Sequence, residues 1–139
     1  MLDRPKLHRE LAQDIVNETL PAKHEALRRS EAALAEGAPI GFVLSTPEPD
    51  IWFLERSRFS AHEFSLSPNV GGLEGALLYV HRDRAEAARE RYHDSLDPLN
   101  REACAVEVVT AEEGLNRHIA FLRRRIAEDT AFARRHGAL

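Results

Sequence analysis

The sequence contains few residues of several kinds, and each shortage excludes a class of protein. Its single cysteine, Cys104, excludes an intramolecular disulfide, and the apolar run around it (ACAVEVV) predicts a buried structural thiol rather than a reactive one. No apolar run approaches the ~18 residues that cross a bilayer, and the first ten residues lack the apolar stretch of a signal peptide. We therefore expect a soluble, cytoplasmic protein that does not bind membranes.

Lysine is also scarce, because Lys6 and Lys23 are the only two among 19 basic residues. An arginine bias of this kind, with abundant alanine, is typical of a GC-rich bacterial genome; the alternative is selection for bidentate recognition of carboxylate or phosphate. The net charge of −4 argues against a nucleic-acid-binding surface. The length of 139 residues and the 43% hydrophobic content predict one domain, 1–139, with a core of its own.

An apolar stripe at helical spacing predicts that residues 5–36 form an N-terminal helical arm. Leu7, Leu11 and Ile15 recur every four residues, which places them on one side of a helix. Pro21 interrupts the pattern, because proline lacks a backbone donor and clashes with the preceding turn. We therefore expect either one kinked helix or two helices in this segment.

Alternating and β-branched segments predict an antiparallel sheet. Residues 40–45, 51–60 and 62–67 are rich in strand formers and are joined by short connections, which favours a meander of three strands. Residues 103–110 are largely apolar and β-branched, so we expect this strand at the centre of the sheet. The segment 76–81 supplies a further strand in the interpretation that we favour.

The segment after the glycines has a second interpretation, a continuous helix from residue 73. That helix would contain Gly75, at a cost of about 1 kcal/mol relative to alanine. We favour a helix that begins at residue 84, because Asp83 opens a capping box there. Thr110 opens another capping box, before a final amphipathic helix. The predicted fold is α+β, with a helical arm, a mainly antiparallel sheet of four to five strands, and two further helices on one of its faces.

The glycine cluster is a candidate phosphate-binding loop. Gly71 and Gly72 follow a strand, as such a loop requires, but no lysine follows them and neither of the two common phosphate-loop motifs is present. The alternative is a hairpin turn in which glycine takes a positive φ. We favour the hairpin, and a helix beginning at residue 73 would favour the phosphate site.

Four segments together resemble the GNAT-type acetyltransferases: GFVLS, FSLSPNVGGLEGALL, VEVVT and NRHIAFL. The resemblance covers roughly residues 22–137. It implies an N-acyltransferase that uses acetyl-CoA or another acyl-CoA, with the pyrophosphate held by Val70, Gly71, Gly72 and Gly75. The loop lacks the arginine or glutamine that begins it in that family, and the final helix has no tyrosine to act as general acid. We keep this enzyme as an alternative.

The remaining candidate residues are histidines and one strand face. The seven histidines form no metal-binding motif, so no metal site is expected, but His62 and His81 lie at strand ends, where pockets often form. Trp52, Arg56 and Arg58 alternate onto one face of a strand, which suits recognition of an acidic partner or a carboxylate. The alternative is that Trp52 completes the core while the arginines reach the rim.

The absence of a catalytic motif favours a small binding or accessory protein (an adaptor, immunity or chaperone-like protein) that acts through protein–protein contacts. Its partner would be another protein or a second copy of the chain, bound through the Trp52 face or the N-terminal helix, without a cofactor. A third interpretation is a small-molecule-binding domain whose pocket is framed by His62, His81 and Arg56. The sequence thus favours binding over catalysis and leaves the enzyme as the alternative.

Overall fold

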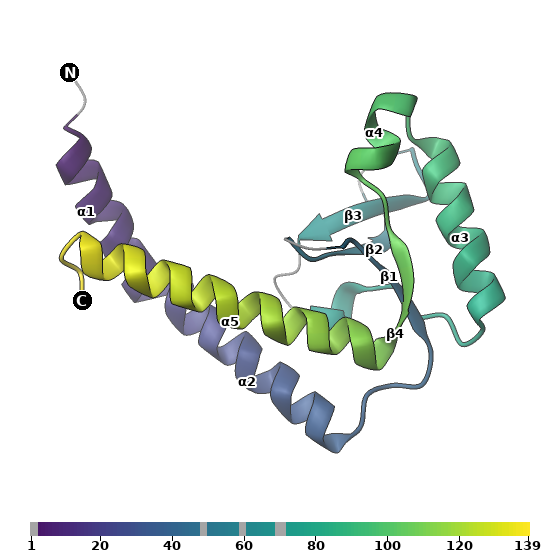
Figure 1. The fold of residues 1–139 in the computed structure, drawn as a ribbon, viewed down its shortest axis with the longest axis horizontal. Coiled ribbons are helices and arrows are strands. Elements are labelled where there is room, and N and C mark those ends of the chain that lie inside the picture. Colours follow the sequence, from purple (N-terminus) through teal and green to yellow (C-terminus); the bar gives the residue numbers. More distant parts are fainter. Residues whose placement is uncertain (1–2, 48–49, 59–60, 69–71) are drawn as a thin grey trace.

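The structure is a computed structural model that describes residues 3–47, 50–58, 61–68 and 72–139. A four-stranded antiparallel sheet lies between helices, and a pair of helices extends away from it (Figure 1). The predicted α+β class, with its N-terminal helical arm and mainly antiparallel sheet, is confirmed.

The N-terminal arm is one helical rod that continues through Pro21. The interruption takes the form of a single π-helical turn, in which the Leu20 N–H donates to the carbonyl of Ile15, five residues back. The wider turn directly precedes the proline, where a regular helix would lose a hydrogen bond and meet a steric clash. The rod consists of α1 (Arg4–Asp14), the π-helical turn (Ile15–Thr19) and α2 (Leu20–Glu36).

The sheet has the strand order β3-β2-β1-β4, and every neighbouring pair is antiparallel. The prediction that the last strand is central is wrong, because β4 lies at an edge. Its apolar character has another cause: Val109 packs on one face of the sheet and Val108 on the other, so both faces of this edge strand are covered. The strands are β1 (Phe42–Ser45), β2 (Trp52–Arg56), β3 (Phe64–Pro68) and β4 (Glu107–Thr110).

Residues 76–81 form neither of the predicted structures. Tyr79 makes one isolated bridge to Phe42, with N···O distances of 2.7 and 2.8 Å. The Leu77 N–H also donates to Leu54 O of β2, at 3.1 Å. The segment therefore bonds to both β1 and β2. A 3₁₀ turn, Gly72–Gly75, precedes it, so no helix begins at residue 73.

Helix α3 spans Arg82–Ser95 and begins two residues before the predicted start. His81 occupies the N-cap position, whereas the Asp83 carboxylate accepts from the neighbouring Arg84 N–H, at 3.0 Å. The sequence signal at Asp83 therefore marked the first turn of the helix rather than its cap. The other two helices are α4 (Pro98–Ala103) and α5 (Ala111–Arg135).

The helices α3 and α5 cover opposite faces of the sheet, which corrects the prediction that both lie on one face (Figure 1). Leu44 and Tyr92 belong to the cluster beneath α3, whereas Val43 packs in the cluster that includes Phe121 of α5. Successive residues of a strand point to opposite faces. The adjacent apolar residues Val43 and Leu44 therefore require a layer on each side.

Candidate functional site

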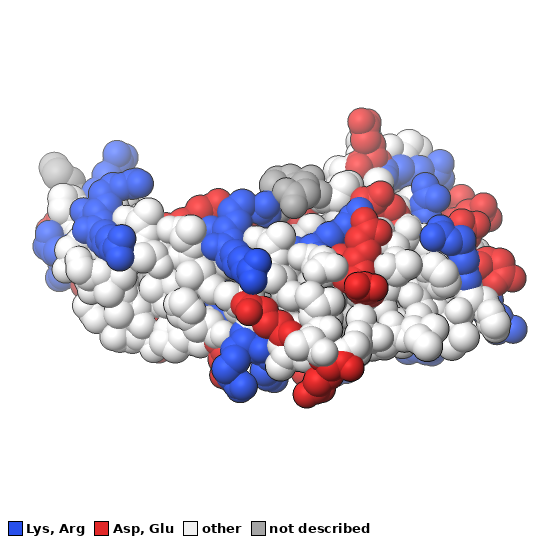
Figure 2. Space-filling view, turned by 60° about the horizontal axis from the view of Figure 1, so that its bottom comes forward, with Lys and Arg blue, Asp and Glu red and all other residues white. Residues whose placement is uncertain are grey.

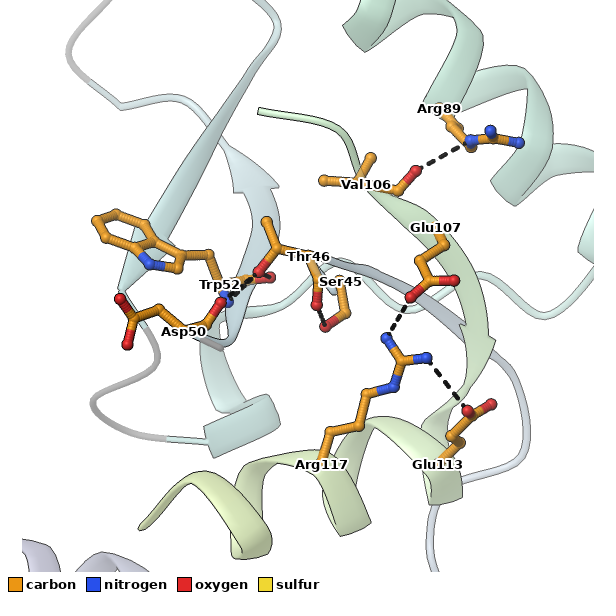
Figure 3. Close-up of polar contacts among 9 residues, drawn as sticks. All are labelled: Ser45, Thr46, Asp50, Trp52, Arg89, Val106, Glu107, Glu113 and Arg117. Atoms are coloured by element: carbon orange, nitrogen blue, oxygen red, sulfur yellow. Dashed lines mark hydrogen bonds and ion pairs between the residues drawn. The ribbon is translucent and has the colours of Figure 1, made fainter. Parts of the chain in front are cut away.

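Among the described residues of the turn between β1 and β2, the side chain of Thr46 holds the two ends together (Figure 3). Its hydroxyl donates to the backbone carbonyl of Asp50 at 2.9 Å and accepts from the Trp52 N–H at 2.7 Å. The Thr46 N–H also donates to the carbonyl of Trp52, at 2.9 Å. These bonds fix the backbone at Asp50 and Trp52, so their side chains project from a defined frame.

These residues border a cavity of about 590 Å³ between the sheet and α4, which we call the Trp52 cavity. Trp52 is 37% exposed, although it is a large apolar residue. The opposite wall comes from α4. Its N-cap residue is Asp97, whose carboxylate accepts from the N–H groups of Leu99 and Asn100, each at 3.1 Å. The cavity is lined by residues 46–47, Asp50, Trp52, Leu66, Tyr92 and residues 102–105.

The Trp52 cavity is acidic at its exposed edges and apolar between them. Asp50 and Glu102 are both exposed, and none of the described lining residues is basic. Burial raises the pKa of Tyr92 to about 12, so its hydroxyl stays protonated at physiological pH. The arrangement suits a group that carries positive charge and has an apolar body.

The predicted recognition face of β2 is divided between the two ends of the strand. Trp52 pairs with Pro68 at one end, whereas Arg56 pairs with Phe64 at the other. Arg56 and Arg58 are exposed, and neither lines the Trp52 cavity. The carboxylates of Asp50 and Glu102, rather than the guanidinium groups of Arg56 and Arg58, therefore line the same cavity as Trp52.

The predicted histidine pocket is not among the described cavities. His62 lies in the loop before β3, and His81 precedes α3; both are exposed, and neither lines the cavities described here. Gly71 lies outside the described residues. Gly72 opens the 3₁₀ turn, and α3 starts only at Arg82, so Gly72 is not at the helix N-terminus that the acyl-CoA interpretation requires.

Gly72 instead covers a buried histidine that the sequence analysis did not single out. His118 of α5 is fully buried, and neither ring nitrogen has a hydrogen-bond partner among the described residues. A Cβ added to Gly72, which has a φ of +79°, would lie 3.2 Å from His118 Nε2. The spacing of the sequence did indicate that His118 is buried. It follows Leu115 by three residues and precedes Leu122 by four, and both leucines are buried.

A second surface is formed by residues 3–14 of the N-terminal rod together with residues 123–139 of α5. From here on, the helical arm means these two segments. Its two helices meet where His8 of α1 contacts the rings of Phe132 and His136, with ring centroids 6.1 and 4.7 Å apart. Leu7 and Leu11 of α1 are 45% and 51% exposed. The predicted apolar stripe is therefore buried at Ile15 and open to solvent over α1.

The charges of the chain are divided between the arm and the rest. The arm has eight basic and five acidic residues, a net charge of +3, so the other residues carry −7 of the total of −4. On the face drawn in Figure 2, the arm at the left shows basic side chains and a broad uncharged area, whereas most acidic side chains lie over the remainder. The arm is therefore net basic, whereas the rest of the chain is net acidic.

Comparisons with protein-family models, with curated proteins and with solved structures find no match to this chain. Among the described residues, no helix is both long and apolar enough to cross a membrane. Within that same part of the chain, no group of three or more histidine, cysteine or acidic residues is placed to hold a metal ion.

Proposed function

We propose that this protein is a non-catalytic binding protein that docks a partner protein through its helical arm. The observation that supports the proposal is the exposure of Leu7 and Leu11 on a helix that projects away from the sheet (Figure 1). Two leucines four residues apart form a continuous apolar strip on a helix, and helix-on-helix recognition uses anchors at this spacing.

The charge of the arm favours a partner with an acidic surface over a second copy of this chain. Two arms packed symmetrically would bring together two regions that each carry a net charge of +3. An arm packed on the acidic remainder of another copy would be a head-to-tail contact, which extends into chains unless its rotation closes a ring. A different protein with apolar side chains among carboxylates has neither disadvantage.

The test compares wild type with the double variant Leu7→Glu/Leu11→Glu in pull-down from the native host, followed by reconstitution with the purified partner. Burial of two leucines is worth about 3 kcal/mol, so the double variant should weaken binding by about 100-fold. The matched control is Leu99→Glu, which places the same charge on an exposed leucine of α4.

The proposal is supported if wild type and Leu99→Glu form a stoichiometric complex with an acidic protein and the arm variant does not. A partner that binds the arm variant as tightly as wild type would contradict it. Light scattering decides the remaining alternative, because a dimer of wild type that the arm substitutions dissociate would assign the arm to self-association instead.

A further inference from the structure

We infer that the Trp52 cavity binds a small organic cation with an apolar body, such as an alkyl- or arylammonium. This inference concerns a different surface from the arm and does not depend on the protein–protein function. It rests on the exposed indole of Trp52, on the carboxylates of Asp50 and Glu102, and on the 590 Å³ volume between them.

The positive charge of the ligand would lie at the Trp52 side of the cavity. Figure 3 shows the Asp50 carboxylate and the Trp52 ring projecting from the same turn, on the same side of the strand. An indole face attracts cations through its quadrupole, and a carboxylate adds a charge-assisted hydrogen bond. Glu102 contributes a second negative charge from α4. An anionic ligand would meet two carboxylates and, among the described lining residues, no basic group.

The apolar body would occupy the interior of the cavity. Leu66, Ala103 and Ala105 line it, and Tyr92 adds a buried ring. A volume of about 590 Å³ falls within the range of roughly 300–1,000 Å³ that is usual for small-molecule pockets. Such pockets combine apolar walls with a few fixed polar groups, and this cavity has both.

The backbone that carries the groups that would contact the cation is held in place without a ligand. Thr46 bonds to the backbone on both sides of Ile51, which itself is buried, so the Asp50–Trp52 segment is anchored in the sheet. Glu102 stands on a helix that Asp97 caps. Prior ordering of this kind reduces the entropy lost on binding, and it distinguishes the site from a chance cluster of surface carboxylates.

Trp52 is the only tryptophan in the chain, so its intrinsic fluorescence reports directly on the cavity. Purified full-length protein is titrated with 2-phenylethylammonium, 2-phenylethanol and 3-phenylpropionate, three probes of similar size that carry a positive, zero and negative charge. The cation should give a saturable change with a Kd below about 1 mM. The alcohol should bind at least about tenfold more weakly, and the anion should not saturate.

Two neutralising variants test the carboxylates. Asp50→Asn and Glu102→Gln should each weaken binding of the cation by about tenfold, whereas Glu90→Gln, at an exposed position of α3 outside the cavity, should leave it unchanged. Thermal melts of each variant verify folding; Glu102 is exposed on α4, so its variant carries the test if Asp50→Asn unfolds. Absence of saturation by the cation, equal binding of the anion, or unchanged affinity in both variants would overturn the inference.

Discussion

Replacing His118 with leucine should make the protein more stable and less sensitive to acid. The imidazole is fully buried, and both ring nitrogens lack a partner among the described residues. An unsatisfied buried polar group costs about 1–3 kcal/mol. Leucine has a similar volume and no polar atom, so His118→Leu should raise the free energy of unfolding at pH 7 by an amount in that range.

The acid sensitivity follows from the pKa of His118. Burial lowers this pKa to about 4, from an ordinary value near 6.5. The unfolded chain therefore binds the proton at a higher pH than the folded chain does. As far as His118 is concerned, the free energy of unfolding is highest above pH 6.5 and falls as the pH drops from 6.5 to 4. Below pH 4 this group causes no further change. At pH 5 the loss from this group is about 2 kcal/mol.

Urea denaturation at pH 8 and pH 5, followed by circular dichroism, measures both effects. The variant His118→Gln is the matched control, because it keeps a buried polar group and removes only the titration. Leucine should raise stability at both pH values and remove about 2 kcal/mol of the pH dependence; glutamine should remove the pH dependence without the gain at pH 8. A leucine variant that is less stable at pH 8 would refute the reasoning, since it would mean that the imidazole makes a favourable contact.

Two further substitutions test the packing of α5 against the sheet. Gly114→Ala should lower the free energy of unfolding by about 1–3 kcal/mol in a thermal or urea melt, because the added Cβ would lie 2.8 Å from Val43 Cγ2; no loss, or equal loss in a Val43→Ala background, would contradict this cause. Arg117 donates to Glu107 of β4 at 2.7 Å and to Glu113 of α5 at 3.2 Å (Figure 3). Arg117→Met should lower the free energy of unfolding by about 1 kcal/mol. If these bonds cause the loss, the same substitution should cause no further loss in a Glu107→Gln/Glu113→Gln background.

The parts of the fold that local sequence determines were predicted well. Thr110 caps α5 as expected, because the Glu113 N–H donates to its hydroxyl at 3.1 Å. The strands β1, β2 and β3 fall within or beside the predicted ranges, since alternation and turn residues act over a few positions. The error at Asp83 was also local, because its carboxylate bonds one residue on instead of capping the helix.

The features that depend on tertiary packing were not predictable from these patterns. The apolar composition of β4 indicated that both of its faces are buried. This is true of a central strand and of a covered edge strand, so composition could not distinguish the two. Asp50 and Glu102 come from distant segments, and only the fold places them around one cavity. Asp97 followed by Pro98 is a helix-start signal, but the predicted fold contains no helix at this position, so the wall formed by α4 was missed.

The π-helical turn before Pro21 has a consequence for how this protein can change over time. Ile15 and Leu20 are both buried although five residues separate them, one more than a regular turn accommodates. A π-helical turn absorbs one extra residue, so that positions five apart share a face, as positions four apart do in a regular helix. Loss of one codon between residues 15 and 19 would therefore convert this turn into a regular one and leave Leu7 and Leu11 facing nearly the same side. A lineage can thus lose this residue without redirecting α1 relative to α2.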